Sequence, residues 1–298
     1  MIGIDKTLFR RIFRRIFKAY VDHSGVFKEL RAENFGPQNL YMPKGVETGN
    51  RDHLYWLTLV ALSDKRTNSA MLYYCFAKMF SRNKNLFKRG EYPTLSRMTE
   101  LFRAYKIALP VMEIAFFIER KRHLDELFGG DPLNIFVGTH DIDELMVKFD
   151  AIARQNGIAN LFPGAKKKIF SLLAMFLSEF TELQFADVVP IDVWVQSIAN
   201  STSVLTGEGQ IDINTLEQML RPLMTSVFSE FKHLKGTSNA TWIHGRALCT
   251  NCGRVNTSSL CSVYEECKGP FKRMRHPVSG KLYGRIQVPA DFMPKGIV

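Results

Sequence analysis

A turn between two helical patterns, within residues 159–196, limits how this chain of 298 residues can fold. Asn156 and Gly157 end an amphipathic run, Pro163 and Gly164 interrupt the chain again, and the apolar run 169–177 follows. Pro and Gly break regular structure, and an apolar run of that length is typical of a buried helix. The stretch therefore predicts helix, tight turn and buried helix in succession.

Three lysines, Lys166, Lys167 and Lys168, stand where the second helix is expected to begin. The first N–H groups of a helix lack partners within it, so backbone donors and side-chain cations point the same way and favour phosphate. Positive potential there also favours the uncharged, nucleophilic form of the Lys168 amine. Solvated lysines without chemistry are the alternative.

Asp192 follows Pro190 and opens another apolar run, a position typical of a helix N-cap. A carboxylate there is compatible with two roles at once. It can cap its helix, and it can assist proton transfer or stabilise a cationic sugar-like transition state.

Composition favours a folded protein with an anionic partner. Apolar residues make up 46% of the chain, 23 Phe among them, and the net charge is +11. Nucleic acid is the first candidate partner. No run of 18 apolar residues and no N-terminal signal core is present, so we expect neither a membrane span nor secretion. The expected location is the cytoplasm or nucleoid, or the nucleus of a eukaryote.

Periodicity predicts a nearly all-helical chain. Expected helices cover 5–20, 53–79 with a polar interruption at 62–68, 94–108, 111–128, 141–155, 214–235 and 242–249. The run 5–20 has an apolar face and an arginine-rich face. It is interpreted as a helix packed on the body with a basic side, with a membrane-surface helix as the alternative.

Four of the five cysteines crowd into 19 residues, at positions Cys249, Cys252, Cys261 and Cys267. Their C-x2-C-x8-C-x5-C spacing suits a tetrahedral zinc or a four-iron, four-sulfur cluster, and spacing alone slightly favours zinc. His244 is interpreted as structural, because four cysteines already complete a ligand set. Cys75 is interpreted as a buried small hydrophobe.

Residues 162–177, FPGAKKKIFSLLAMFL, followed by VPIDVWVQSI, resemble the helix-hairpin-helix DNA glycosylase superfamily, in particular its endonuclease III and 8-oxoguanine branches. The family's Schiff-base lysine falls on Lys168 and its aspartate on Asp192. IHGRALC, ending at Cys249, resembles the opening of the iron–sulfur loop in the endonuclease III branch, and LSDKRT at 62–67 resembles the loop that enters the duplex.

The resemblance implies two helical lobes with a helix-hairpin-helix between them. One lobe is expected at 54–184, and the other at 1–53 and 185–298, with the metal loop at 249–267 and a basic C-terminal tail. It implies a bifunctional DNA glycosylase and AP lyase of base-excision repair, acting on double-stranded DNA with a damaged base or abasic site. Expected DNA contacts are Pro163, Gly164, Lys166, Lys167, Lys65, Arg66, Lys268, Lys272 and Arg273.

This chain departs from the family pattern in several places. Lys166 replaces the second hairpin glycine, Lys65 the loop glutamine and Trp194 a histidine, and the cysteine spacing differs. With the resemblance included, an iron–sulfur cluster is preferred and structural zinc is the alternative. A non-catalytic protein that binds DNA or RNA structure on the same scaffold is the alternative function. A monomer that does not bind membranes is expected.

Overall fold

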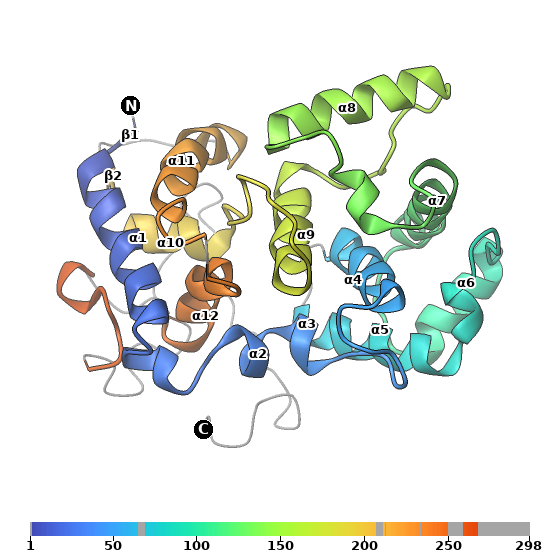
Figure 1. Cartoon of the computed structure of the whole chain (residues 1–298), viewed down its shortest axis with the longest axis horizontal. Coiled ribbons are helices and arrows are strands. Elements are labelled where there is room, and N and C mark those ends of the chain that lie inside the picture. The colour runs from blue at the N-terminus through green and yellow to red at the C-terminus, as the bar shows by residue number, and fades with distance from the viewer. Residues whose placement is uncertain are drawn as a thin grey trace. The chain divides into compact units, whose positions relative to one another are not determined.

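The structure is a computed structural model that describes residues 2–64, 69–206, 211, 213–232, 234–249 and 259–267. These residues are mostly helical, and the strands among them form a two-residue antiparallel pair (Figure 1). The expected helical class is confirmed at this level. Contacts group the described residues up to Gly36 with those from Val189 onward, and group Pro37–Val188 as a second unit. The lobe bounds given above stay a prediction.

The first unit contains the chain's N-terminal helix and the helices that follow Val189. Its elements are β1 (Gly3–Ile4), α1 (Lys6–Val21), η1 (Gly25–Lys28), α2 (Ala32–Phe35), α10 (Val193–Ser201), β2 (Leu205–Thr206), α11 (Ile213–Phe228), η4 (Thr237–Asn239), α12 (Ala240–Ala247) and η6 (Tyr264–Glu266). β1 pairs antiparallel with β2, with Gly3 opposite Thr206, which ties the start of the chain to the segment after α10.

Helix α1 supplies much of the first unit's core. Asp5 caps it by accepting a hydrogen bond from the Leu8 backbone N–H at 2.9 Å. One face, repeating every three or four residues, is fully buried against α11 and α12: Phe9, Ile12, Phe13, Ile16, Phe17 and Tyr20. The expectation that this amphipathic helix packs on the body is therefore confirmed.

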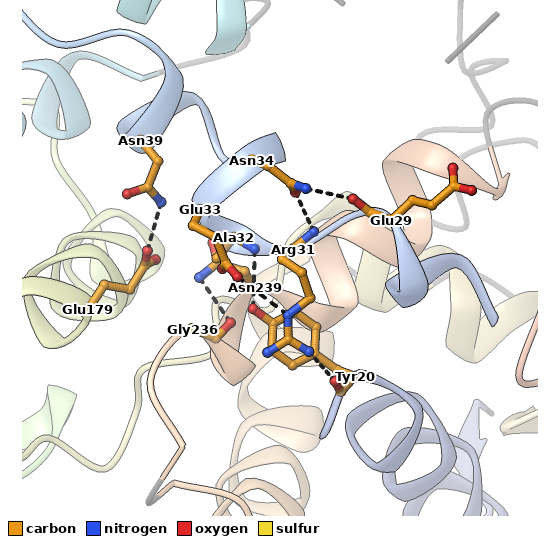
Figure 2. A network of polar contacts seen from close by, with 10 residues as sticks. All are labelled: Tyr20, Glu29, Arg31, Ala32, Glu33, Asn34, Asn39, Glu179, Gly236 and Asn239. Atoms are coloured by element: carbon orange, nitrogen blue, oxygen red, sulfur yellow. Dashed lines mark hydrogen bonds and ion pairs between the residues drawn. The ribbon is translucent and has the colours of Figure 1, made fainter. Parts of the chain in front are cut away.

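Two close approaches hold elements of the first unit together. A Cβ added at Gly245 would lie 2.7 Å from Trp194 atoms, so only glycine lets α10 and α12 pack this closely. Arg31, just before α2, lies over the Tyr20 ring at 3.8 Å and donates to the Tyr20 carbonyl, as Figure 2 shows. The α2 segment is thereby held on α1.

The second unit is a helical bundle. Its elements are α3 (Pro37–Leu40), α4 (Arg51–Ser63), α5 (Ser69–Arg82), η2 (Lys84–Phe87), α6 (Leu95–Ala104), α7 (Val111–Leu127), η3 (Pro132–Ile135), α8 (Ile142–Gln155) and α9 (Lys167–Phe180). Helix α4 is buried along almost its whole length and packs against α5, α7 and α9 (Figure 1). In the same unit Asn39 donates to Glu179 on α9 at 3.1 Å (Figure 2).

Some element bounds differ from the expectations. The helix expected at 214–235 begins at Ile213 and ends at Phe228, because the Phe231 N–H turns back to the Phe228 carbonyl at 2.8 Å. The stretch 21–51, which none of the expected helices covers, contains η1, α2 and α3, each four residues long. The expected basic C-terminal tail, after residue 267, lies outside the described residues.

Candidate functional site

The predicted turn lies between α8 and α9. The Ala165 N–H donates to the Phe162 carbonyl at 3.0 Å, and Gly164 has a φ of 74°. Pro followed by a residue with positive φ, closed by this hydrogen bond, is the pattern of a type II turn. Asn160 Oδ1 accepts from the Phe162 N–H at 3.1 Å and steadies the approach. The Pro-Gly pair therefore forms the tight turn that the sequence predicts.

A buried arginine supports this turn from beneath. Arg120 on α7 is fully buried, and its Nε donates to the Pro163 carbonyl at 2.9 Å. Its Nη2 donates to the same carbonyl and, at 3.1 Å, to Glu113. Burial lowers the pKa of Arg120, although the Glu113 carboxylate opposes that shift. Sequence periodicity missed this residue, since nothing in the pattern of 111–128 separates Arg120 from its exposed neighbours.

Helix α9 begins immediately after the turn, with a cationic and uncapped N-terminus. Lys166 occupies the N-cap position and makes no side-chain cap, because an ammonium group cannot accept a hydrogen bond. Its backbone carbonyl accepts from the Ile169 N–H at 2.8 Å. Uncapped N–H groups at a helix start are suited to an anion such as phosphate.

The three lysines differ in their surroundings. Lys167 forms an ion pair with Asp143 in the first turn of α8. Lys166 and Lys168 are exposed, and within the described part of the chain neither forms an ion pair. Lys168 is thus an accessible amine one residue inside the helix start.

Asp192 is the N-cap of α10, as predicted. Its Oδ1 accepts from the Trp194 N–H at 2.8 Å and the Val195 N–H at 3.0 Å, and its side chain is half-buried. These bonds hold the carboxylate in one orientation. Lys168 belongs to the second unit and Asp192 to the first.

One described cysteine of the cluster, Cys261, lies near a buried histidine. Cys261 Sγ is 3.8 Å from His244 Nε2, and His244 is fully buried. A sulfur and a nitrogen bound to one tetrahedral zinc stand about 3.6 Å apart, so this pair has the spacing of shared ligands. Burial lowers the pKa of His244 to about 4, which keeps the imidazole neutral, as a metal ligand must be. His244, interpreted from the sequence as structural, thus joins the candidate donors.

The other candidate metal ligands are only partly described. Cys249 and Cys267 are half-buried, and Cys252 lies outside the described residues. Among the described residues, no three metal-binding side chains gather closely enough to hold an ion. Thiolates with an imidazole are soft donors that fit zinc or an iron–sulfur centre, so the donor chemistry fits either group.

Five predicted DNA contacts lie outside the described residues: Lys65, Arg66, Lys268, Lys272 and Arg273. Those described, Pro163, Gly164, Lys166 and Lys167, lie together at the turn and the start of α9. None of the described helices is long and apolar enough to cross a membrane. Comparison with protein-family models, with curated proteins and with solved structures found no match.

Proposed function

We propose that this chain is a helix-hairpin-helix DNA glycosylase with AP lyase activity. In this proposal α8, the turn at 162–165 and α9 form the hairpin motif, set between two helical lobes, and the cysteine segment forms a metal loop. The observation that carries it is the accessible Lys168 amine, presented one residue inside an uncapped helix start directly after a Pro-Gly turn.

DNA is the partner that this arrangement favours. Uncapped N–H groups at α9 and the exposed Lys166 offer a site for one backbone phosphate of a duplex. Arg120 fixes the Pro163 carbonyl, so the turn is organised before DNA arrives. A damaged nucleotide would be extruded from the stack to reach the lysine.

In the proposed reaction, the Lys168 amine and the Asp192 carboxylate act on the sugar of the damaged nucleotide. The neutral Lys168 Nζ attacks the sugar C1′, the N-glycosidic bond breaks, and the base leaves with a proton. Ring opening gives a Schiff base between Lys168 and C1′. Loss of the C2′ proton then breaks the bond from C3′ to the 3′ phosphate, which nicks the strand. Asp192 stabilises positive charge on the sugar and relays protons.

The cysteine segment has a structural role in this proposal. We assign Cys249, Cys252, Cys261 and Cys267 to a four-iron, four-sulfur cluster, with structural zinc as the alternative. The spacing of His244 and Cys261 gives zinc added weight. Iron, sulfide and zinc content of the purified protein distinguishes the two groups.

A non-catalytic binder on the same scaffold is the second candidate. Lys166 occupies the N-cap of α9, where the family has a glycine, and adds a positive charge that can bind phosphate. This substitution favours a protein that binds DNA without cleaving it. Under this alternative Lys168 contributes only to affinity.

Strand cleavage at a single abasic site separates the two functions. The proposal predicts that wild type nicks this duplex and that Lys168→Ala binds it without nicking. Asp192→Asn keeps the helix cap, since Asn caps as well as Asp, so a loss of cleavage there reports on charge. Lys166→Ala is the matched control and should still nick. Wild-type binding without cleavage on abasic DNA and on a panel of damaged bases would support the non-catalytic alternative.

A further inference from the structure

A shallow groove of about 510 Å³ runs along the solvent side of α1 in the first unit. It is lined by Thr7, Arg10, Arg11, Arg14, Arg15 and Lys18 of α1 and by Glu230 and Phe231, which follow α11. All five cations are exposed. None of them belongs to the hairpin, and the proposed lysine chemistry does not use them.

The cations repeat along the helix at the spacing of one turn. Arg10, Arg14 and Lys18 stand four residues apart, as do Arg11 and Arg15. Each step advances about 6 Å along the axis. A row of charges at this spacing is suited to an extended polyanion with regularly repeated charges, and a shallow groove suits an extended ligand better than a small one.

Internal carboxylates neutralise only part of this charge. Glu230 pairs with Arg14, Glu266 with Arg15 and, at 3.9 Å, with Arg11, and Asp22 pairs with Lys18 at 3.0 Å. Arg10 forms no ion pair within the described part of the chain. Five cations therefore face three carboxylates, and the groove keeps an excess of positive charge.

The opposite face of α1 argues against a lipid partner. Insertion into a membrane interface requires an apolar face that is free to enter the acyl region. Phe9, Phe13 and Phe17 are fully buried in the core of this unit. Only the basic side is available, and the half-buried Phe231 is the one aromatic residue among those that line the groove.

We propose that the α1 groove is a second binding surface for the phosphate backbone of DNA, separate from the hairpin. Glu230 competes with phosphate for Arg14, so the acidic partner limits affinity. This proposal rests on the proposed DNA partner, and it does not depend on the chemistry of Lys168.

Affinity of the full chain for an undamaged duplex, measured by fluorescence anisotropy across a salt series, tests the groove. Arg10→Ala/Lys18→Ala leaves the Arg14 and Arg15 ion pairs in place. It should weaken binding about tenfold and reduce the salt slope by about 2, at roughly 0.9 per lost phosphate contact. Lys28→Ala/Lys232→Ala removes the same charge from exposed positions of the same unit outside the groove and should change both quantities much less.

Glu230→Gln should change DNA affinity and the salt slope in the opposite direction. It removes the competing charge and keeps the side chain's size, so binding should tighten about threefold and the slope should steepen by about 1. The proposal would be overturned if Arg10→Ala/Lys18→Ala had the same DNA affinity and salt slope as the control variant. It would also be overturned if Glu230→Gln bound DNA no more tightly than wild type. Loss of binding to anionic-lipid vesicles by Arg10→Ala/Lys18→Ala, with its DNA affinity kept, would overturn it as well. Absence of strand cleavage alongside the expected shifts would count against the lysine chemistry and leave the groove standing.

Discussion

At the scale of single residues, buried charge organises the second unit. Arg120 binds the turn carbonyl and Glu113, while Lys121 on the same helix binds Asp125 at 2.9 Å and the Lys88 carbonyl at 2.8 Å. A buried charge that keeps its partners is tolerated, and loss of one partner is costly. Through the Pro163 and Lys88 carbonyls, these two residues hold the turn before α9 and the segment after η2 on α7.

Arg120→Ala should lower the free energy of unfolding by about 3–5 kcal/mol, because the Pro163 carbonyl and Glu113 lose their buried partner. Arg122→Ala, on the exposed side of α7, is the control and should change stability by less than about 0.5 kcal/mol. Denaturant unfolding of both variants measures the difference. Equal stabilities would show that Arg120 does not support the turn.

His53 predicts a pH dependence of stability. It is fully buried on α4, its Nδ1 accepts from the Gly49 N–H at 2.9 Å, and burial lowers its pKa from 6.5 to about 4. In the unfolded chain the His53 imidazole becomes protonated below about pH 6.5, whereas in the folded chain it becomes protonated only near pH 4. The free energy of unfolding is therefore not reduced by His53 above pH 6.5. It decreases as the pH falls toward 4, by up to about 3 kcal/mol.

His53→Gln should make the stability loss between pH 6.5 and 4 smaller than in wild type. His140→Gln, at an exposed position of the same unit, is the control and should retain the wild-type slope. Urea unfolding at a series of pH values gives both slopes. Identical slopes for wild type and His53→Gln would contradict the assignment.

Single residues also mark the limit of prediction from the sequence. Asp192 could be placed at a helix start because its cap is local, made to N–H groups two and three residues away. Arg120 and His244 could not be placed, since their partners Pro163 and Cys261 lie 43 and 17 residues away. Periodicity carries no information on such contacts.

At the scale of elements, the turn between α8 and α9 determines where α9 begins. Gly164 at a φ of 74° lets the chain reverse so that α9 starts two residues after the closing hydrogen bond. Asp141 caps α8 through the N–H groups of Asp143 and Glu144, both at 2.9 Å, so both helices flanking the turn begin where sequence signals place them.

Gly164→Ala should cost about 1–2 kcal/mol of stability, because a residue with a Cβ is strained at this φ. DNA affinity should fall as well, since the turn presents the start of α9. Gly138→Ala is the matched control, with a φ of 75° and no heavy atom within 4 Å of an added Cβ. Its stability loss should be similar and its DNA affinity unchanged. Equal DNA affinities for the two variants would remove the turn from the binding surface.

Helix starts were easier to predict than helix ends. Thr94 and Asp141 are local caps, and both precede helices that begin at the next residue, Leu95 and Ile142. The end of α11 at Phe228 depends on the following turn, and the apolar pattern continues past it. β1 and β2 were missed because two-residue strands leave no periodic signal.

At the scale of the whole molecule, the proposed catalytic pair is divided between the two units. Lys168 is a residue of α9 in the second unit, and Asp192 is the cap of α10 in the first. The predominance of helix followed from periodicity alone. Membership of a unit did not, because it is set by long-range contacts such as those of α1 with α11 and α12.

In the proposed chemistry, Lys168 is the amine that attacks the sugar. Borohydride reduction of wild type mixed with a duplex carrying one abasic site tests this assignment, with Lys168→Ala and Lys166→Ala in parallel. We expect a covalent protein–DNA adduct with wild type and Lys166→Ala, mapped to Lys168 by peptide mass spectrometry, and none with Lys168→Ala. An adduct that persists in Lys168→Ala, or none with wild type under conditions where the duplex is bound, would contradict it.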